Sequence, residues 1–120
     1  MIKVKRAYEP PGPADGKRYL VDRLWPRGVK KSALHIEAWL KDVSPTPALI
    51  RWFGHDPKKW DEFRRRYRKE LDRNRQALDP ILKAARRGRI TLVYGARDIE
   101  HNNALVLKSY AEKKLGAEEE

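Results

Sequence analysis

The sequence has 120 residues, a formal net charge of +11 and no cysteine. This length suits one domain with its own hydrophobic core. The lack of cysteine excludes disulfides, a thiolate nucleophile and cysteine-ligated zinc, and the positive charge favours anionic partners such as nucleic acid or phosphorylated metabolites.

No apolar stretch is long enough to span a membrane, and the N-terminal MIKVKRAYEP lacks the apolar core of a signal peptide. A cytoplasmic protein without a membrane partner is therefore expected. The three histidines are isolated, and no pair has a spacing typical of metal ligands. No metal site and no cofactor are predicted.

The first part of the chain predicts two strands. IKVKRAY, from Ile2, alternates apolar and basic residues, as a strand with one exposed face does, and EPPGPADG is a loop. KRYLVDRLWPRG predicts a second strand centred on Tyr19 to Leu24. Asp15 and Gly16 suit a hairpin turn between these strands, and a parallel pair is the alternative.

The middle of the chain predicts helices. KKSALHIEAWLKDVSP fits a helix or a short strand around Ile36 to Leu40, and SPTPALIRWFGHDP fits a short helix. From Asp56 an amphipathic helix is predicted, because the side chains of one stripe recur at steps of three and four: Trp60, Phe63, Tyr67, Leu71, Asn74 and Leu78. Pro80 is expected to break this helix from a shorter one that follows.

RITLVYGA predicts a buried strand, and a helix follows from about Ile99 to Leu115. Residues 116–120 form an acidic tail that is expected to be disordered. A helix, a strand buried on both faces and another helix indicate one α/β domain, residues 1–115, with a mostly parallel sheet flanked by helices.

A dense polar segment joins this strand to the last helix. In an open α/β sheet, ligands bind where strands end and helices begin. Asp98 is expected to cap the helix, and free amides near Arg97 would then favour an anion. Asn103 shares the buried helix face with Ile99 and needs hydrogen-bond partners there. In the simpler interpretation, these residues only hold the loop and His101 lies in solvent.

Two further polar segments come earlier. Asp22 and Arg23 follow an apolar strand, and Arg27 follows Trp25 and a proline. Two arginines beside an aromatic surface suit a phosphate or a stacked base, whereas a buried Asp22–arginine ion pair is the structural alternative. In RWFGHDPKKW, His55 precedes a helix cap, where it could act as an acid or base.

The run RRRYRK and the later KAARRGR are strongly basic. Most of these side chains are expected to form a solvated helix face, partly paired with neighbouring acidic residues. The alternative is a basic stripe that follows a phosphate backbone.

The blocks VDRLWPRG, WFGHDPKKWDEFRRRYRKEL and YGARDIEHNNALVL resemble the signature blocks of the YeaO-like family, bacterial and archaeal proteins without a settled activity. The resemblance runs from Val4 to Leu115. It implies a small Rossmann-like three-layer α/β domain, distantly similar to rhodaneses, with YLVDR and TLVYGA ending at one edge of a parallel sheet. That arrangement disfavours the hairpin. Because the joint has no cysteine, a rhodanese or cysteine-phosphatase mechanism is excluded.

Together these features predict an Arg-rich pocket at the strand ends, which binds a phosphate-containing or other anionic small ligand, such as a nucleotide, and could be catalytic. The candidate catalytic residues are His55, His101, Asp22 and Asp98. The candidate ligand-binding residues are Arg23, Trp25, Arg27, Trp52, Tyr94, Arg97, Asn102 and Asn103.

Two other functions stay open. A basic, regulatory nucleic-acid-binding module without enzymatic activity would use the arginine-rich helix and exposed aromatic side chains. An interaction protein, monomeric or homodimeric, would use Leu105, which is expected opposite the apolar face of the last helix.

Overall fold

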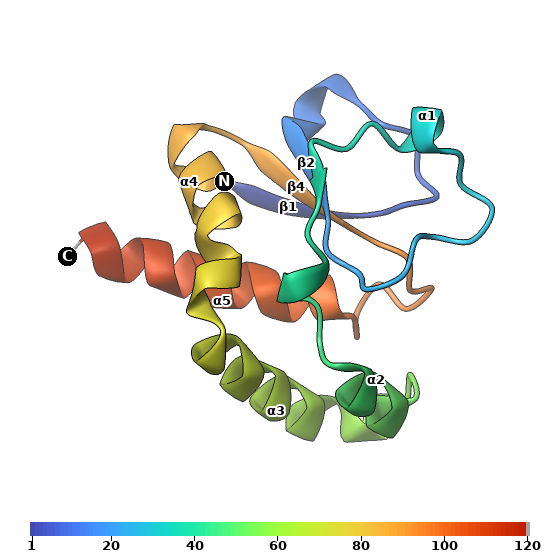
Figure 1. The fold of residues 1–120 in the computed structure, drawn as a ribbon, viewed down its shortest axis with the longest axis vertical. Coiled ribbons are helices and arrows are strands. Elements are labelled where there is room, and N and C mark those ends of the chain that lie inside the picture. The colour runs from blue at the N-terminus through green and yellow to red at the C-terminus, as the bar shows by residue number, and fades with distance from the viewer. Residues whose placement is uncertain (120) are drawn as a thin grey trace.

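The computed structural model describes residues 1–119, except the side chains of residues 118 and 119. Within that range the strands form one parallel sheet in the order β1-β4-β2-β3, which confirms the predicted α/β class (Figure 1). The strands are β1 (Ile2–Arg6), β2 (Lys17–Leu20), β3 (Ala38–Trp39) and β4 (Ile90–Tyr94). The α-helices are α1 (Lys31–Leu34), α2 (Pro47–Phe53), α3 (Trp60–Arg73), α4 (Asp79–Arg87) and α5 (Asn103–Glu119).

Strand β4 lies inside the sheet because its apolar residues can all be buried. It pairs in parallel with β1 and with β2, so that Leu92 is opposite both Val4 and Tyr19. Since β4 separates β1 from β2, the hairpin alternative is excluded. Gly16 (φ 63°) instead passes so close to β4 that a Cβ would lie 2.0 Å from the carbonyl oxygen of Arg89.

Alternation along the strands sends side chains into two cores of unequal size. Tyr19 and Leu92 belong to the main core, which α2, α3, α4 and α5 cover. Leu20 and Val93 belong to a smaller core, beneath Leu34 of α1. Figure 1 shows the long helices gathered on one side of the sheet and the short α1 on the other. The second outer layer is therefore a loop with one helical turn.

Strand β2 is shorter than predicted, and the ambiguous segment 36–40 supplies β3 beside it. The strand ends at Leu20, although the N–H of Val21 still donates to β4 at 3.1 Å. The chain then leaves the sheet at Asp22. Leu24 was included in the predicted strand because it is apolar, but it is 79% exposed and packs in no core. Apolar character alone therefore overestimated the length of the strand.

The break between α3 and α4 comes before Pro80, so this prediction is wrong in position. Asn74 leaves the helical conformation (φ −135°, ψ 47°), and its side-chain amide donates to the carbonyl oxygen of Asp42 at 3.1 Å. Pro80 instead lies in the first turn of α4, where its missing N–H costs no intrahelical hydrogen bond. The buried stripe of α3 is as predicted: Phe63, Tyr67 and Leu71.

Helix α5 begins at Asn103, whereas the prediction began at Ile99. The side-chain oxygen of Asn102 accepts the N–H of Leu105 at 3.0 Å and therefore caps the helix. The expected cap, Asp98, accepts the N–H groups of the preceding turn instead. Ile99 is 64% exposed and does not share the buried face. Leu105 is half-buried rather than exposed on the outer face.

Helix α5 continues to Glu119, so the predicted domain boundary at residue 115 falls inside it. Gly116 does not end the helix, because one glycine costs only about 1 kcal/mol relative to alanine. Residue 120 of the expected tail lies outside the described residues. Even this helix of 17 residues is not long and apolar enough to cross a membrane, and neither is any other described helix.

A buried ion cluster ties the segment before β2 to β1. The carboxylate of Asp15, which is 2% exposed, accepts hydrogen bonds from Arg18 at 2.6 Å, Lys5 at 3.2 Å and the N–H of Gly12 at 3.1 Å. The hydroxyl of Thr91 donates to the backbone oxygen of Asp15 at 2.7 Å. Burial opposes the charge on Asp15, but the hydrogen bonds outweigh it and lower the pKa to about 2.

This lowered pKa predicts an acid-sensitive contribution to stability. A depressed carboxyl pKa stabilises the fold above the unfolded value of 3.8, and this stability is lost as the pH falls through the folded value of about 2. Allowing for screening by solvent, we expect Asp15 to contribute about 1 to 2 kcal/mol. Urea unfolding at pH 6 and pH 3 should show a smaller difference in Asp15→Asn than in the native chain. An unchanged difference would contradict the assignment.

Candidate functional site

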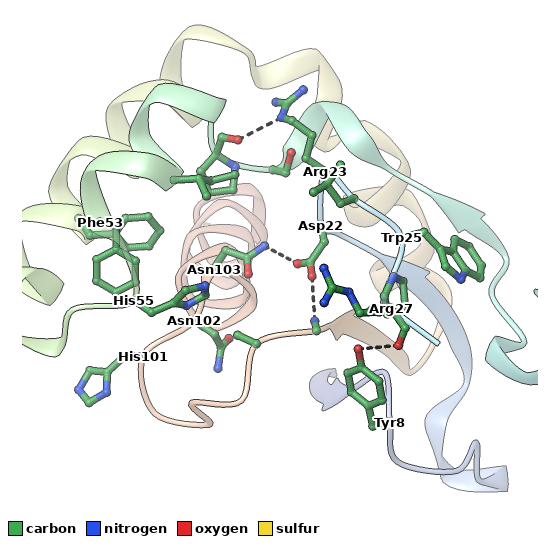
Figure 2. Close-up of a pocket in the computed structure, with 18 residues that line it drawn as sticks. Tyr8, Asp22, Arg23, Trp25, Arg27, Phe53, His55, His101, Asn102 and Asn103 are labelled. Carbon is green, nitrogen blue, oxygen red and sulfur yellow. Dashed lines mark hydrogen bonds between the residues drawn. The ribbon is translucent and has the colours of Figure 1, made fainter. Parts of the chain in front are cut away.

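A cavity of about 520 Å³ opens at the carboxyl edge of the sheet, where β1, β2 and β4 end (Figure 2). This is the edge at which open α/β sheets bind ligands, and the volume falls in the usual range for small-molecule sites. Its sheet side is formed by Tyr8, by residues 22–27 and by Gly95 with Ala96. Its helix side includes Phe53, Phe63 and the start of α5.

Asp22 lines this cavity and joins three segments of the chain. One carboxylate oxygen accepts the N–H of Gly95 at 2.8 Å, and the other accepts the side-chain amide of Asn103 at 3.0 Å. The same amide donates to the carbonyl oxygen of Val21 at 3.2 Å. A side chain at residue 95 would bring its Cβ within 3.3 Å of the carboxylate, so glycine allows this approach. Asn103 was expected to need hydrogen-bond partners, and it finds them at the end of β2.

The environment of Asp22 disfavours its charged form. Burial raises its pKa, and it outweighs the hydrogen bonds from Asn103 and Gly95 and the nearby positive charge of His55, which lower it. The two oxygens bond to amides rather than to an arginine, so the structure does not contain the alternative Asp22–arginine ion pair. Asp22 therefore remains available as an acceptor facing the cavity.

His55 reaches the cavity because of an unusual backbone turn. Gly54 ends α2 in the left-handed conformation (φ 55°), and His55 follows in the same region (φ 56°), which is uncommon for a residue with a side chain. The next residue, Asp56, caps the following turn by accepting the N–H of Lys58 at 3.0 Å. Figure 2 shows His55 between Phe53 and the start of α5.

His101 and Asp98, two of the four candidate catalytic residues, lie within hydrogen-bonding distance of each other. The Nδ1 atom of His101 lies 2.9 Å from a carboxylate oxygen of Asp98, and the ring meets Trp60 edge-on at 5.3 Å. The N–H of Glu100 and the contacts with His101 lower the pKa of Asp98. His101 lines the cavity, whereas Asp98 does not. Figure 2 shows His101 at the edge of the site, away from Asp22.

Two of the predicted arginines border the cavity. The Nε of Arg23 donates to the carbonyl oxygen of Pro45 at 3.3 Å, and both residues line the cavity. Arg27 is exposed, and its backbone oxygen accepts the hydroxyl of Tyr8 at 3.0 Å. In Figure 2 the Arg27 side chain points toward the middle of the site. Together they place positive charge on the lining of the cavity.

Three other predicted ligand-binding residues do not line the cavity. Arg97 is exposed and lies outside the cavity, and Tyr94 is buried in the main core. Trp52 also lies outside the cavity, with the charged groups of Lys59 and Arg66 at 5.2 and 4.1 Å from its ring. The alternation of β4 explains the position of Tyr94, because odd and even residues face opposite cores.

Two residues line the cavity but use their polar atoms for structure. Trp25 donates to the carbonyl oxygen of Val29 at 2.6 Å and packs edge-on against Trp39 at 5.4 Å. Asn102 is 2% exposed, and its amide donates to the backbone oxygen of Asp98 while its oxygen caps α5. Neither offers a free polar group to a ligand.

Sequence reasoning missed several residues of the cavity wall. Tyr8 lies just after the end of β1, which pairs with β4. Its position at a strand end was the signal that could have identified it. Phe63 was predicted only as part of the buried stripe of α3. Ser44, Pro45 and Ile50 come from the segment around α2, and no local pattern in the sequence links that segment to the strand ends.

The basic face of α3 is partly paired with acidic residues of the same helix. Arg64 bonds to Asp61 at 2.6 Å, and Arg65 and Arg66 both bond to Glu62, at 2.6 and 2.8 Å. These pairs match the sequence expectation of a solvated, partly paired face.

The fold and the cavity define a small α/β protein with an open pocket, partly polar and partly apolar, at the carboxyl ends of its strands. A family model described as the inactive DUF488-N3 subclade matches residues 1–120, and the chain belongs to this YeaO-like DUF488 family. The predicted family is thereby confirmed.

The similar proteins are themselves described as uncharacterised. The chain is 38% identical to YeaO of Escherichia coli over 109 residues, which covers 91% of this chain and 95% of YeaO. It is 40% identical to a protein of Mycobacterium tuberculosis and to one of Mycobacterium bovis over 106 residues, 88% of this chain and 89% of each relative. No solved structure matches the chain.

Proposed function

We propose that this protein binds a small phosphate-containing or otherwise anionic ligand in the cavity at the strand ends, without catalysing its conversion. One observation carries the proposal: Arg23, Arg27 and His55 converge on a single cavity of ligand size. An arginine on the lining of a cavity is suited to phosphate, because its planar group makes two parallel charge-assisted hydrogen bonds.

Binding is favoured over catalysis for two reasons. The family is described as inactive, and this chain has no cysteine to act as a nucleophile. The His101–Asp98 pair has the geometry of a general base and its orienting group, but it lies at the edge of the cavity. His55 and Asp22 are more central and are suited to hold a ligand rather than to attack it.

The cavity also supports this proposal better than the alternative of nucleic-acid binding along α3. Three arginines of the basic run are held by Asp61 and Glu62 on their own helix, which leaves less free charge for a phosphate backbone. Binding along that surface would weaken steeply with salt and would be indifferent to changes inside the cavity.

We expect Arg27→Ala to weaken the binding of inorganic phosphate or pyrophosphate by about tenfold or more, because it removes a charge-assisted hydrogen bond worth at least 1.5 kcal/mol or so. Isothermal titration calorimetry at low salt measures this effect directly. Arg97→Ala is the matched control, since it removes an equal charge from an exposed position outside the cavity.

The two variants separate a specific site from general electrostatic attraction. Loss of affinity confined to Arg27→Ala supports the cavity. Equal losses in both variants, or no binding of any anion by the native chain, would overturn the proposal.

A further inference from the structure

The cavity contains a carboxyl group as well as its positive groups, which an anion-binding site alone does not explain. Asp22 and Arg23 are half-buried and Arg27 is exposed, and all three line the cavity. A carboxylate repels a phosphate, so it disfavours a ligand that is anionic throughout. The arrangement suits a ligand with a hydrogen-bond donor at one end and an anionic group at the other.

Asp22 has room to accept further hydrogen bonds. A carboxylate offers about four acceptor positions, and the N–H of Gly95 and the amide of Asn103 occupy one on each oxygen. One donor is a backbone N–H and the other is the half-buried side chain that begins α5, so they hold the carboxylate in a fixed direction. Asp22 lines the cavity, so a ligand there would supply donors for the remaining positions.

Much of the remaining cavity lining is apolar. Phe53 and Phe63 stack with their ring centres 4.3 Å apart, and both line the cavity. Leu24, Tyr8 and Ile50 also line it, although they are 79%, 47% and 39% exposed. Exposed apolar side chains gathered around a cavity are typical of a surface that a ligand covers. A planar ring would use these walls, whereas a small zwitterion would not.

We propose that the ligand is a nucleotide whose base carries an exocyclic amino group, with the base edge at Asp22 and the phosphate at Arg27 and Arg23. This inference rests on the proposed function and adds the identity of the ligand class. Cytosine and adenine present an amino donor to a carboxylate, whereas uracil and hypoxanthine present at the same position a carbonyl oxygen that the carboxylate repels. The nucleotide can be free or part of a single strand, since both sources share this chemistry.

The test compares nucleotides in which this amino donor is replaced by a carbonyl oxygen and the adjacent ring nitrogen gains a proton. Isothermal titration calorimetry of the full chain would use cytidine monophosphate against uridine monophosphate, and adenosine monophosphate against inosine monophosphate. We expect the amino-bearing member of each pair to bind about tenfold tighter or more, since one good base contact discriminates by about 1 to 3 kcal/mol. Equal affinities within both pairs, or tighter binding of the keto member, would overturn the inference.

A variant series tests the role of Asp22 itself. Asp22→Ala should remove the preference within each pair, whereas Asp61→Ala, at a side chain that is 89% exposed on α3, should keep it. If Asp22→Ala does not fold, the pair comparison in the native chain still decides the question. A preference that persists in a folded Asp22→Ala protein counts against the inference.

Short oligonucleotides distinguish the two sources of the nucleotide. Tight binding of oligocytidylate over oligouridylate, together with weak binding of the monomers, would point to single-stranded nucleic acid, and tight monomer binding to free nucleotides. Equal binding of both oligomers that is indifferent to Arg27→Ala would contradict the inference. If inorganic phosphate binds in an Arg27-dependent manner but no pair shows a preference, the inference fails and the proposed function stands. If no anion depends on Arg27, both fail.

Discussion

We expect Asp15→Ala to lower the free energy of unfolding by about 3 kcal/mol, because removing one partner of a buried ion pair leaves the other charge uncompensated. Arg18 is 4% exposed, and its Nη1 atom lies 2.6 Å from Asp15. Another guanidinium nitrogen, Nη2, is already buried without a hydrogen-bond partner. The chain therefore offers Arg18 no substitute for the lost carboxylate. Urea unfolding at neutral pH measures the change.

Asp61→Ala provides the control for this substitution. Asp61 also lies 2.6 Å from an arginine, but its side chain is 89% exposed and that of Arg64 is 40% exposed. Exposed pairs of this kind contribute little, so we expect a change below about 1 kcal/mol. Similar losses in the two variants would show that burial of the Asp15 pair does not determine its contribution.

Phe63→Ala should destabilise the protein by about 3 to 5 kcal/mol, the range for truncation of a buried phenylalanine. Phe63 is 2% exposed, stacks on Phe53 at 4.3 Å and lies 5.8 Å from the ring of Tyr67. Its removal leaves a void where α2 and α3 meet. Because Phe63 also lines the cavity, we expect ligand binding to weaken together with stability.

Leu24→Ala separates these two effects. Leu24 lines the same cavity but is 79% exposed, so its truncation should change the free energy of unfolding by less than about 0.5 kcal/mol. Thermal or urea unfolding of both variants is the measurement. A loss below 1 kcal/mol in Phe63→Ala would show that the core repacks around the missing ring.

Most of the fold followed from local patterns in the sequence. The uninterrupted apolar run of β4 predicted a strand buried on both faces, and the spacing of Phe63, Tyr67 and Leu71 predicted the buried face of α3. Helix boundaries were less accurate, because several polar residues compete to cap a helix. Asp98 and Asn102 are both suitable caps, and only the path of the chain after β4 selects Asn102.

The location of the candidate site was also predictable, but the residues that line it were not. Polar residues follow β2 and β4, and parallel strands bring their carboxyl ends to one edge. Whether a residue there faces the cavity depends on the turn that carries it. His55 turns inward through its left-handed backbone, whereas Arg97, only two residues after Gly95, remains outside.

The sequence by itself determined the α/β class, the burial of β4, the absence of thiol chemistry and the edge of the sheet that carries the polar residues. These properties depend on residue type and on short-range periodicity. Only the tertiary structure decided that Tyr8, Asp22 and Phe63 share one cavity and that Asp15 is buried against Arg18. Those relations join segments that are distant along the chain, and they arise because the sheet order places β4 between β1 and β2.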